Sequence, residues 1–598
     1  MPTYRAPLTD YTFLIDRFLK TDRYRHLPGY AELDSDTRTA ILTEAAAFCE
    51  DVLLPLNQSG DLEGCRFENG QVRTPRGFPN AYSRFVRGGW PALPFDTADG
   101  GHGLPHLMSV PISEMMVSAN MSFSGYVDIT QAAATTIHAH GSDWQKRVFL
   151  PPLVSGRWGG TMNLTEAHAG TDLGLMRTRA EPASDGTYRI TGAKIFITGV
   201  DHDLTENIVN LVLARLPGGP PGTKGISLFI VPKFLPAEDG SLGQRNAITV
   251  IGVEHKMGVR ASATCAVNYE NAVGYLVGNP HDGLRAMFTM MNDTRLGVGI
   301  QGLGMSEVAS QNARAYAAER LQGRAPAGPA ALDLPADPIV YHPDVRRMLS
   351  VIEAFNQSAR ALALWTGLQF DIAHHEADAE ARQAADDLLA LLTPAIKAHF
   401  TDCSFENVNL ALQCFGGHGY IREWGMEQFV RDCRITQIYE GTNGVQAMDL
   451  VGRKLTIAGG RLPARFFALV EQDLTVANDT AAISTLANNL RIALGMLRQL
   501  TAWVQGMGQS ERERIAAGSS DYLRLFGMVA LGWTWLKLAN IAANEPHDNA
   551  FLKQKLALAH FYLTRLVPEA RMLAERAMLG DNLPRVTDFL KPADAVQI

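Results

Sequence analysis

Cysteine is scarce in this chain and follows no pattern. Six cysteines are spread over 598 residues, and they form neither a CxxC pair nor the closely spaced set of a disulfide-stapled domain. Disulfides are typical of oxidising compartments, so this spacing favours a reduced, cytoplasmic location.

Long hydrophobic runs are also missing. Residues 1–30 carry charges throughout, and no window approaches the roughly 18 uninterrupted apolar residues of a membrane span. We therefore expect neither a secretory signal nor a transmembrane segment. The chain ends in Ala595-Val596-Gln597-Ile598 and not in a Ser-Lys-Leu peroxisomal signal, and we expect a soluble, intracellular protein.

Charge of one sign is not in excess, and the common nucleotide-binding motifs are absent. The formal net charge of -8 singles out neither nucleic acid nor membrane as a partner, although local basic groups can bind a phosphorylated ligand. No GxGxxG opens a helix directly after a predicted strand, and neither GxxxxGKS nor GxxxxGKT occurs. These absences exclude a Rossmann dinucleotide site and a P-loop.

The composition is that of a large globular protein. Hydrophobic residues make up 46% and charged residues 19% of the chain. The length exceeds what one hydrophobic core supports, so three or four domains are expected. We predict an α+β multidomain fold with an N-terminal α-helical domain at residues 1–157, a β-barrel or sandwich at 158–280, a four-helix bundle at 281–457 and an additional helical domain at 464–598.

Apolar spacing is the basis of these assignments. Apolar residues recur at helical spacing in the first, third and fourth segments, whereas the second has short β-branched runs between Asp-Gly and Pro-Gly turns. The predicted strands are 188–197, 207–213, 226–231 and 247–251. Residues 324–340 are rich in Pro and Ala and are expected to form a surface loop between two helices.

One carboxylate has unusual neighbours. Glu440 lies between Tyr439 and Gly441, shortly after the glycine-rich run 416–420. Apolar bulk on one side and flexible backbone on the other can desolvate a carboxylate enough to make it a base for a weakly acidic proton. The alternative is an ordinary Glu in a loop or at a helix start, and these residues alone do not exclude it.

Two segments of the β-domain are candidates for ligand contact. In residues 163–172 small side chains let backbone N–H groups and the Thr165 and Thr171 hydroxyls approach an acceptor-rich ligand, although such segments also form simple capped turns. In residues 194–199, Phe196 can pack on a flat ring and Thr198 can bond to it, although Phe196 is equally compatible with a core position.

Together with their order, these motifs resemble the acyl-CoA dehydrogenase family. The ordered set is LTEAHAGTD at 164–172, KIFITG at 194–199, HKMG at 255–258 with SAT at 262–264, NDTR at 292–295, ER at 319–320, QCFGG at 413–417 and YEGTNGVQ at 439–446. The match runs from Gly89 to about residue 455. The length and the added C-terminal helices resemble a long bacterial subfamily of about 600 residues, which includes broad-range acyl-CoA dehydrogenases and 3-(methylthio)propanoyl-CoA dehydrogenases.

The resemblance implies a reaction. A carboxylate removes the α-proton of an acyl-CoA thioester while the β-hydrogen leaves as hydride to FAD, which gives a trans-2-enoyl-CoA, a step of fatty-acid β-oxidation. No metal is required. Glu440 matches the family's base; some relatives carry that Glu at the position where this chain has Thr294, so Glu440 has no competitor.

The resemblance also implies the binding residues. For FAD they are Leu164, Thr165, Thr171, Phe196, Ile197, Thr198, Arg320, Gln413, Gly416, Gly417, Gly441, Thr442 and Gln446. For acyl-CoA they are Thr171, Asn292, Asp293, Arg295, Glu440 and Gly441. Arg320, Gln413 and the two glycines after it resemble contacts made across a subunit interface, which implies a homo-oligomer, either a dimer or a tetramer.

This sequence departs from the family pattern at a few positions. Ala167 replaces a usual proline, Asn163 a small residue, Phe196 a frequent tryptophan and Gln428 a frequent basic residue. None of these changes removes a catalytic group, and the change at Phe196 alters the edge of the flavin site.

Three functions compete. The first is a dehydrogenase that passes electrons to an electron-transfer flavoprotein, with a straight-chain acyl group or specifically 3-(methylthio)propanoyl-CoA as substrate. The second is an acyl-CoA oxidase that discharges the flavin with oxygen. The third is a scaffold that kept the fold and lost the chemistry, and retention of Glu440 with the flavin motifs disfavours it.

Overall fold

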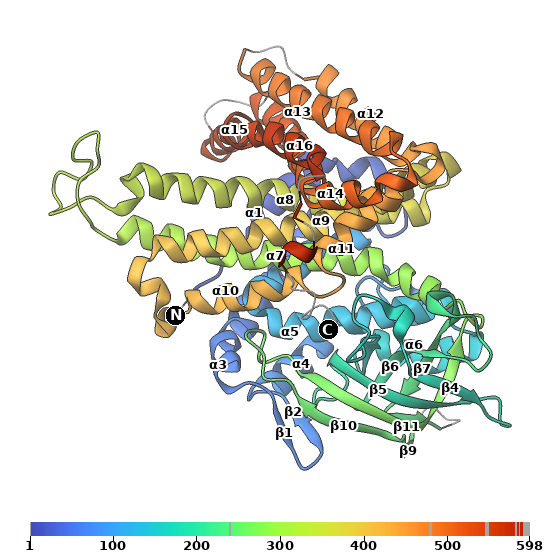
Figure 1. The fold of residues 1–598 in the computed structure, drawn as a ribbon. Coiled ribbons are helices and arrows are strands. Elements are labelled where there is room, and N and C mark those ends of the chain that lie inside the picture. The colour runs from blue at the N-terminus through green and yellow to red at the C-terminus, as the bar shows by residue number, and fades with distance from the viewer. Residues whose placement is uncertain are drawn as a thin grey trace. The chain divides into compact units, whose positions relative to one another are not determined.

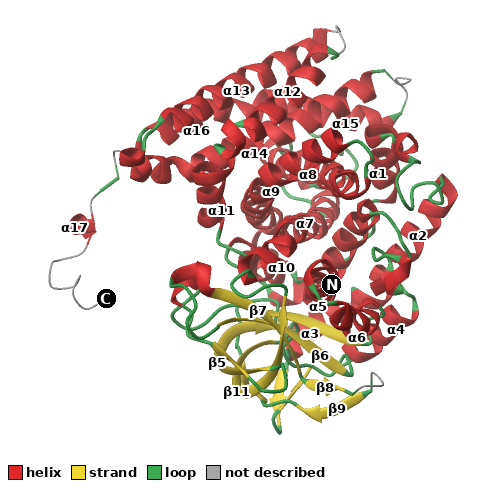
Figure 2. Cartoon of the chain, turned by 90° about the vertical axis from the view of Figure 1, so that its right-hand side faces the viewer, coloured by secondary structure: helices red, strands yellow, loops and turns green. Residues whose placement is uncertain are grey.

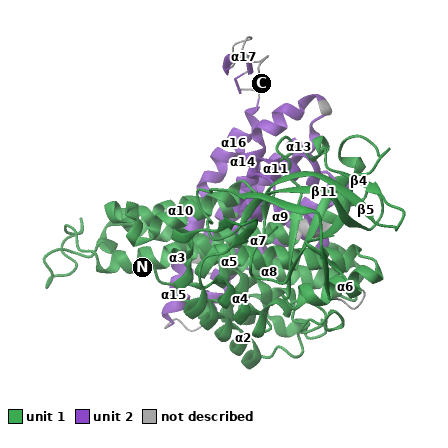
Figure 3. Cartoon of the chain, turned by 90° about the horizontal axis from the view of Figure 1, so that it is seen from below, with its two compact units in different colours: residues 1–385, 400–440 green, residues 386–399, 441–598 purple. Residues whose placement is uncertain are grey.

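A computed structural model describes residues 2–237, 241–477, 481–544, 549–580, 583–584 and 586–589, with backbone only for 288–292, 481–482, 509 and 587. The chain divides into two compact units (Figure 3). Unit 1 comprises Met1–Ala385 and Phe400–Glu440, and unit 2 comprises Asp386–His399 and Gly441–Ile598. This division into two units does not test the four domain boundaries expected from the sequence, and those boundaries remain a prediction.

Unit 1 begins with a helical layer. Its helices are α1 (Leu8–Phe13), α2 (Ser35–Phe48), α3 (Pro55–Glu63), α4 (Phe78–Arg87), α5 (His106–His140) and α6 (Asp143–Val154) (Figure 1). Helix α6 starts at Ser142 in a capping box, in which Ser142 and Gln145 each accept a hydrogen bond from the other's backbone N–H. This cap fixes the last helix before the sheet.

The first segment is α-helical as expected, and it also contains one short hairpin that its helical spacing did not predict. Strands β1 (Arg66–Glu68) and β2 (Gln71–Arg73) form a hairpin inside it. Its two-residue turn is Asn69-Gly70, and both residues have positive φ, 51° and 75°. Asn-Gly is the preferred sequence of such a turn because both positions must adopt left-handed backbone.

The β-domain is a closed barrel with added strands (Figure 2). The strands are β3 (Trp158–Asn163), β4 (Arg179–Pro182), β5 (Tyr188–Thr198), β6 (Asn207–Arg215), β7 (Ile226–Pro232), β8 (Phe234–Pro236), β9 (Leu242–Arg245), β10 (Ile248–Val253) and β11 (Thr264–Val277). The ring runs β11, β5, β4, β6, β7 and back to β11, with β3 parallel on β6 and β10 on β11. All four strands expected from the sequence are confirmed within a few residues.

The barrel is anchored to the helices by its most apolar strands. Every residue of β7 and all but the last of β6 are buried, which is typical of strands covered on both faces. Val209, Leu211 and Ile230 share one core with Phe149 of α6 and Trp158 of β3. The β-domain and the first helical layer therefore form one packed body.

The rest of unit 1 is a helical bundle. It contains α7 (Gly283–Glu319), α8 (Pro343–His375), the end of α9 (Ala379–Cys414) and α10 (Met426–Arg434). Along α8 the predicted apolar stripe is buried, as at Met348, Phe355 and Leu362. The expected surface loop between α7 and α8 is confirmed; the Asp337 carboxylate organises it by accepting hydrogen bonds from the N–H groups of Ala325, Ala330 and Ala331.

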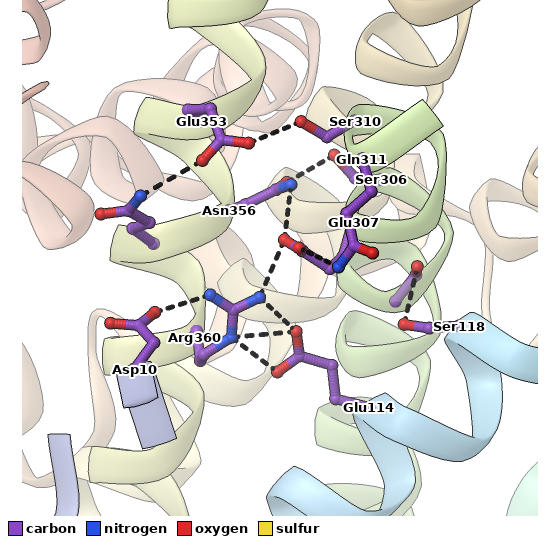
Figure 4. Close-up of polar contacts among 12 residues, drawn as sticks. Asp10, Glu114, Ser118, Ser306, Glu307, Ser310, Gln311, Glu353, Asn356 and Arg360 are labelled. Atoms are coloured by element: carbon purple, nitrogen blue, oxygen red, sulfur yellow. Dashed lines mark hydrogen bonds and ion pairs between the residues drawn. The ribbon is translucent and has the colours of Figure 1, made fainter. Parts of the chain in front are cut away.

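An ionic cluster is buried where α1, α5, α7 and α8 meet (Figure 4). Arg360 lies 2.7 Å from Asp10, 2.6 Å from Glu114 and 2.9 Å from Glu307, and Arg360 is 2% exposed. Burial raises the pKa of Glu114. Such a cluster does not by itself show high stability, but it is sensitive to loss of one partner.

Unit 2 is helical. Besides residues Asp386–His399 it contains α11 (Asn443–Asp449), α12 (Arg461–Thr475), α13 (Ala481–Gly506), α14 (Arg512–Ala543), α15 (Ala550–Phe561), α16 (Ala570–Met578) and α17 (Val586–Phe589). Helix α14 has the length and mean hydropathy of a membrane span, but 83% of the apolar window is buried inside the protein. Helix α14 is the central helix of the unit and gives only weak support for a membrane span. The expected absence of a transmembrane segment stays a prediction.

Candidate active site

Glu440 lies in the loop between a 3-10 turn at Ile435–Gln437 and α11. Its side chain is half-buried and its φ is 54°, in the left-handed region. A non-glycine residue there costs on the order of 1 kcal/mol or more and persists only when its surroundings hold it. Backbone strain of this kind gathers at functional sites, so the geometry singles out the same carboxylate as the sequence.

The residues directly after Glu440 are tightly held within unit 2. Gly441 has φ 81°, and a Cβ at this position would lie 2.6 Å from Gln446 Nε2. The buried Lys397 donates from Nζ to the Gly441 carbonyl at 2.7 Å and to Asn443 Oδ1 at 2.8 Å. The Thr442 hydroxyl caps α11 by accepting from Val445 N–H at 3.3 Å. The predicted residues Gly441, Thr442 and Gln446 therefore share one short turn.

On the β-domain the structure brings two predicted segments side by side. Ile195 N–H donates to the Thr165 carbonyl at 3.0 Å, which places Leu164 and Thr165 beside Phe196–Thr198. Phe196 has φ 60° and is 62% exposed, so it is not the core residue that its apolar character allowed. Ile197, next to it, is buried, and the Thr198 carbonyl accepts from the Thr161 hydroxyl at 2.6 Å.

A buried ion pair supports this surface from behind. Lys194 donates from Nζ to the Leu164 carbonyl at 2.9 Å and to Glu166 Oε1 at 3.0 Å, and its side chain is fully buried. Burial lowers the pKa of Lys194 to about 8. Burial also disfavours the Glu166 carboxylate, but Lys194 and the Thr178 hydroxyl bring the pKa of Glu166 down to about 2. Thr171 lies farther along the loop and is exposed.

A second group lies at one end of the bundle. Arg320 is the C-cap of α7 and Gln413 lies in the last turn of α9, with Gly416 and Gly417 directly after it; all four are exposed. Tyr316, one turn before Arg320, stacks on Phe415 with ring centroids 4.2 Å apart, and its hydroxyl lies 2.8 Å from His418 Nδ1. These aromatic contacts hold the ends of α7 and α9 together.

Three of the residues expected to contact acyl-CoA, Asn292, Asp293 and Arg295, lie on α7. Asp293 Oδ1 lies 2.8 Å from His106 Nε2, and although burial disfavours its ionisation, this partner lowers the pKa of Asp293. Arg295 is buried, with 5% of its surface exposed. The side chain of Asn292 lies outside the described residues.

Sequence reasoning missed the supporting residues. Lys194 and Lys397 were not singled out, although a lysine within an apolar stretch, as in Leu391–Phe400, is a usable signal for a buried cation with a partner. Glu166 was part of a quoted motif without a role. Lys194 bonds to the Leu164 carbonyl and Lys397 to the Gly441 carbonyl, so each lysine holds backbone next to predicted site residues.

The β-domain surface fits a flavin. An exposed aromatic ring at Phe196 offers a flat apolar face, and the Thr165 and Thr198 hydroxyls beside it offer hydrogen bonds. This mixture of one apolar wall and few polar groups is typical of cofactor sites.

Family models cover most of the chain. They match the acyl-CoA dehydrogenase N-terminal domain at residues 35–157, the middle domain at 161–272, the C-terminal domain at 281–455 and the acetyl-CoA dehydrogenase C-terminal-like domain at 466–584.

Individual relatives agree. A 3-methylmercaptopropionyl-CoA dehydrogenase of Ruegeria pomeroyi is 42% identical over 97% of this chain and 98% of its own length. A butyryl-CoA dehydrogenase of Syntrophomonas wolfei is 34% identical over 93% of this chain and 92% of its own length. The crystal structure of an acyl-CoA dehydrogenase complexed with FAD from Bacillus anthracis has the same fold, with a TM-score of 0.73, 20% identity and coverage of 96% of this chain and 92% of that one. With the ordered motifs, the strained Glu440 loop and the flavin-compatible surface, these matches show that the chain belongs to the acyl-CoA dehydrogenase family of FAD-dependent oxidoreductases.

Proposed function

We propose that this protein oxidises an acyl-CoA thioester to the trans-2-enoyl-CoA, with Glu440 as the base that removes the α-proton. The strained, half-buried Glu440 between Tyr439 and Gly441 is the observation that carries the proposal. FAD, when bound, accepts the β-hydrogen as hydride. The chain itself has to bind the thioester, exclude water and hold the carboxylate against the α-carbon.

The backbone beside Glu440 has a second role in this proposal. Removal of the α-proton places negative charge on the thioester oxygen, and a fixed N–H group next to the base stabilises that charge. Lys397 and Gln446 fix the peptide that joins Gly441 to Thr442, since both donate to the Gly441 carbonyl, at 2.7 Å and 3.3 Å. A donor that is already oriented needs no rearrangement during the reaction.

The binding roles are proposed residue by residue. The Leu164–Thr165 and Phe196–Thr198 surface would hold the flavin ring, Thr442 and Gln446 would lie near the adenine end, and Arg295 would contact acyl-CoA. The exposed Arg320, Gln413, Gly416 and Gly417 would reach FAD in a neighbouring subunit. An arginine suits a pyrophosphate because its fork makes bidentate, charge-assisted bonds. Of the other predicted contacts, Asn292 and Asp293 are proposed for the substrate, and Thr171 and Gly441 for both FAD and the substrate.

A short acyl group is the substrate class we propose, with 3-(methylthio)propanoyl-CoA as the specific candidate. Two relatives support it by name, one a 3-methylmercaptopropionyl-CoA dehydrogenase and the other a butyryl-CoA dehydrogenase. Anaerobic titration with butyryl-CoA, octanoyl-CoA and 3-(methylthio)propanoyl-CoA ranks the chain lengths by the rate of flavin bleaching. Fastest bleaching with octanoyl-CoA would contradict the short-chain proposal.

The electron acceptor is proposed to be an electron-transfer flavoprotein. The alternative, an oxidase, shares the first half-reaction and differs in how the flavin is reoxidised. Substrate-reduced protein is mixed with electron-transfer flavoprotein in one sample and with air-saturated buffer in another. Rapid reduction of the flavoprotein with little peroxide is expected, and stoichiometric peroxide would identify the oxidase.

The Glu440 assignment is tested by Glu440→Gln, which removes the base and keeps the shape. FAD should remain bound while bleaching by acyl-CoA under anaerobic conditions is abolished. The matched control is Glu423→Gln, because Glu423 is an exposed glutamate on the neighbouring turn Arg422–Trp424. Normal bleaching by Glu440→Gln would refute the proposal.

Assembly and location complete the proposal. We propose a homo-oligomer, dimer or tetramer, because the FAD contacts at Arg320 and Gly416 would be completed by a second copy. All six cysteines lie in the described part of the chain and are free thiols, which supports a cytoplasmic location. Sedimentation of the holoenzyme and cell fractionation test these two points.

A further inference from the structure

A polar relay inside unit 1 leads to the residue before the proposed base. The Tyr439 hydroxyl donates to Gln301 Oε1 on α7, and Gln301 Nε2 donates to Asp128 Oδ2 on α5 at 3.3 Å. Gln301, at the centre of the relay, is 7% exposed, and Asp128 and Tyr439 on either side of it are half-buried. Three elements far apart in the sequence therefore converge on Tyr439.

The chemistry of the partners fixes the orientation of the Gln301 amide. An ionised carboxylate only accepts hydrogen bonds, so the NH₂ group of Gln301 must face Asp128 and its oxygen must face Tyr439. Burial, and then the charge of Glu440 and Asp128, raise the pKa of Tyr439 well above its usual value, so its hydroxyl keeps the proton it donates. As long as the Asp128 carboxylate is ionised, Tyr439 donates to Gln301 and Gln301 donates to Asp128, and the reverse arrangement is not possible.

Glu440 needs such support because its backbone is strained. Its left-handed φ of 54° is stable only when the residues around it are held in place. Tyr439 is bonded directly to Glu440, so fixing the phenol ring restricts the rotation of the peptide that links the two residues. A displacement of about 1 Å of a catalytic group can cost on the order of 100-fold in rate.

We infer that Gln301 and Asp128 are positioning residues for the proposed base: Asp128 orients Gln301, Gln301 fixes Tyr439, and Tyr439 holds the Glu440 backbone in its left-handed conformation. This inference rests on the role of Glu440 in the proposed function. Nothing in it requires Gln301 or Asp128 to touch the substrate.

The first test is a double-mutant cycle with Gln301→Leu and Tyr439→Phe. Each removes one side of a single hydrogen bond, so each should slow anaerobic bleaching by butyryl-CoA about 10- to 100-fold, and the double variant should be no slower than either. FAD content and the final extent of bleaching should not change. Wild-type rates in both single variants, or fully additive effects, would overturn the inference.

The Glu440→Gln variant separates this inference from the proposed function. If Glu440→Gln bleaches normally, the base assignment fails, and the positioning role fails with it. If Glu440→Gln is inactive while Gln301→Leu and Tyr439→Phe are normal, only the relay is refuted.

A second test uses the charge of Asp128 and needs no cavity-forming change. Burial raises the pKa of Asp128 to about 7; Gln301 opposes this shift and the nearby Asp293 on α7 adds to it. Below that pH a protonated Asp128 can also donate, and the amide of Gln301 loses its single orientation. In Asp128→Asn the new amide can donate or accept at every pH, so the amide of Gln301 lacks a single orientation at every pH.

The ratio of the wild-type to the Asp128→Asn bleaching rate should therefore be about 3 to 10 at pH 8 and approach 1 at pH 6. The charge of Glu440 also acts on Tyr439, so full pH–rate profiles of both proteins are compared to separate the effect of Glu440 from that of Asp128. Two other titratable groups face Tyr439, Cys433 and Asp432 of α10, and both are unchanged by the substitution. A ratio that is the same at pH 6 and pH 8 is the outcome for a merely structural Asp128 and would refute the role proposed here.

Discussion

Replacing Lys194 by Met removes the cation that holds the Leu164–Glu166 loop, proposed to bind the flavin, against β5. The Nζ group makes two contacts, 2.9 Å to the Leu164 carbonyl and 3.0 Å to Glu166 Oε1, and the side chain is fully buried. Methionine has similar length and no charge, so packing is largely kept while both polar contacts are lost. The Leu164 carbonyl and the Glu166 carboxylate must then find other partners.

The free-energy cost of Lys194→Met depends on the hydrogen bonds that the Glu166 carboxylate keeps. Breaking a buried ion pair by removing one partner costs about 3–5 kcal/mol because the other charge is left unpaired. Glu166 would keep three donors, Arg177 N–H at 2.8 Å, Thr178 N–H at 3.0 Å and the Thr178 hydroxyl at 2.6 Å. The lower end, about 3 kcal/mol, is therefore expected.

The assay is titration of the apoprotein with FAD. If the lost free energy of about 3 kcal/mol destabilises only the closed Leu164–Thr165 loop, FAD binding has to supply it. FAD affinity should then fall on the order of 100-fold, since about 1.4 kcal/mol corresponds to a factor of ten. Lys224→Met is the matched control, because Lys224 is exposed on the same domain. The double variant Lys194→Met with Glu166→Gln removes both charges and should recover part of the loss. FAD affinity within threefold of wild type in Lys194→Met would refute the supporting role of the pair.

Three further outcomes are expected. Gly441→Ala should slow bleaching by acyl-CoA more than tenfold, because the left-handed backbone and the neighbouring Gln446 leave no room for a Cβ, whereas Gly444→Ala in the next helical turn should not. Lys397→Met should also slow bleaching with FAD still bound, because it releases the Gly441 carbonyl; an unchanged rate would exclude this role. Arg360→Met should cost about 3–5 kcal/mol of stability, seen as a lower thermal midpoint, because three buried carboxylates lose their counter-charge. An equal drop in Arg346→Met, at an exposed arginine of the same helix, would show that the cluster is not responsible.

Much of the fold was predictable because its patterns are local. The strands at 207–213 and 226–231 appear as short runs rich in Val, Ile and Leu, and these become β6 and β7, which are buried on both faces. The loop at 324–340 is marked by its proline and alanine content. The missed hairpin had an equally local signal, Asn69-Gly70, which was outweighed by the helical spacing around it.

The sequence by itself determined the family and the reaction class and predicted Glu440 as the base, because these depend on residue types in a fixed order along the chain. It could not show that Phe196 is exposed and left-handed, nor that Lys194 in unit 1 and Lys397 in unit 2 are buried. Those properties depend on which distant segments pack together: Tyr439 and Gln301 are 138 residues apart, and Gln301 and Asp128 are 173 apart. Hydrogen bonding and desolvation act over a few ångströms in space, so only the tertiary structure decided which groups hold Glu440 in place.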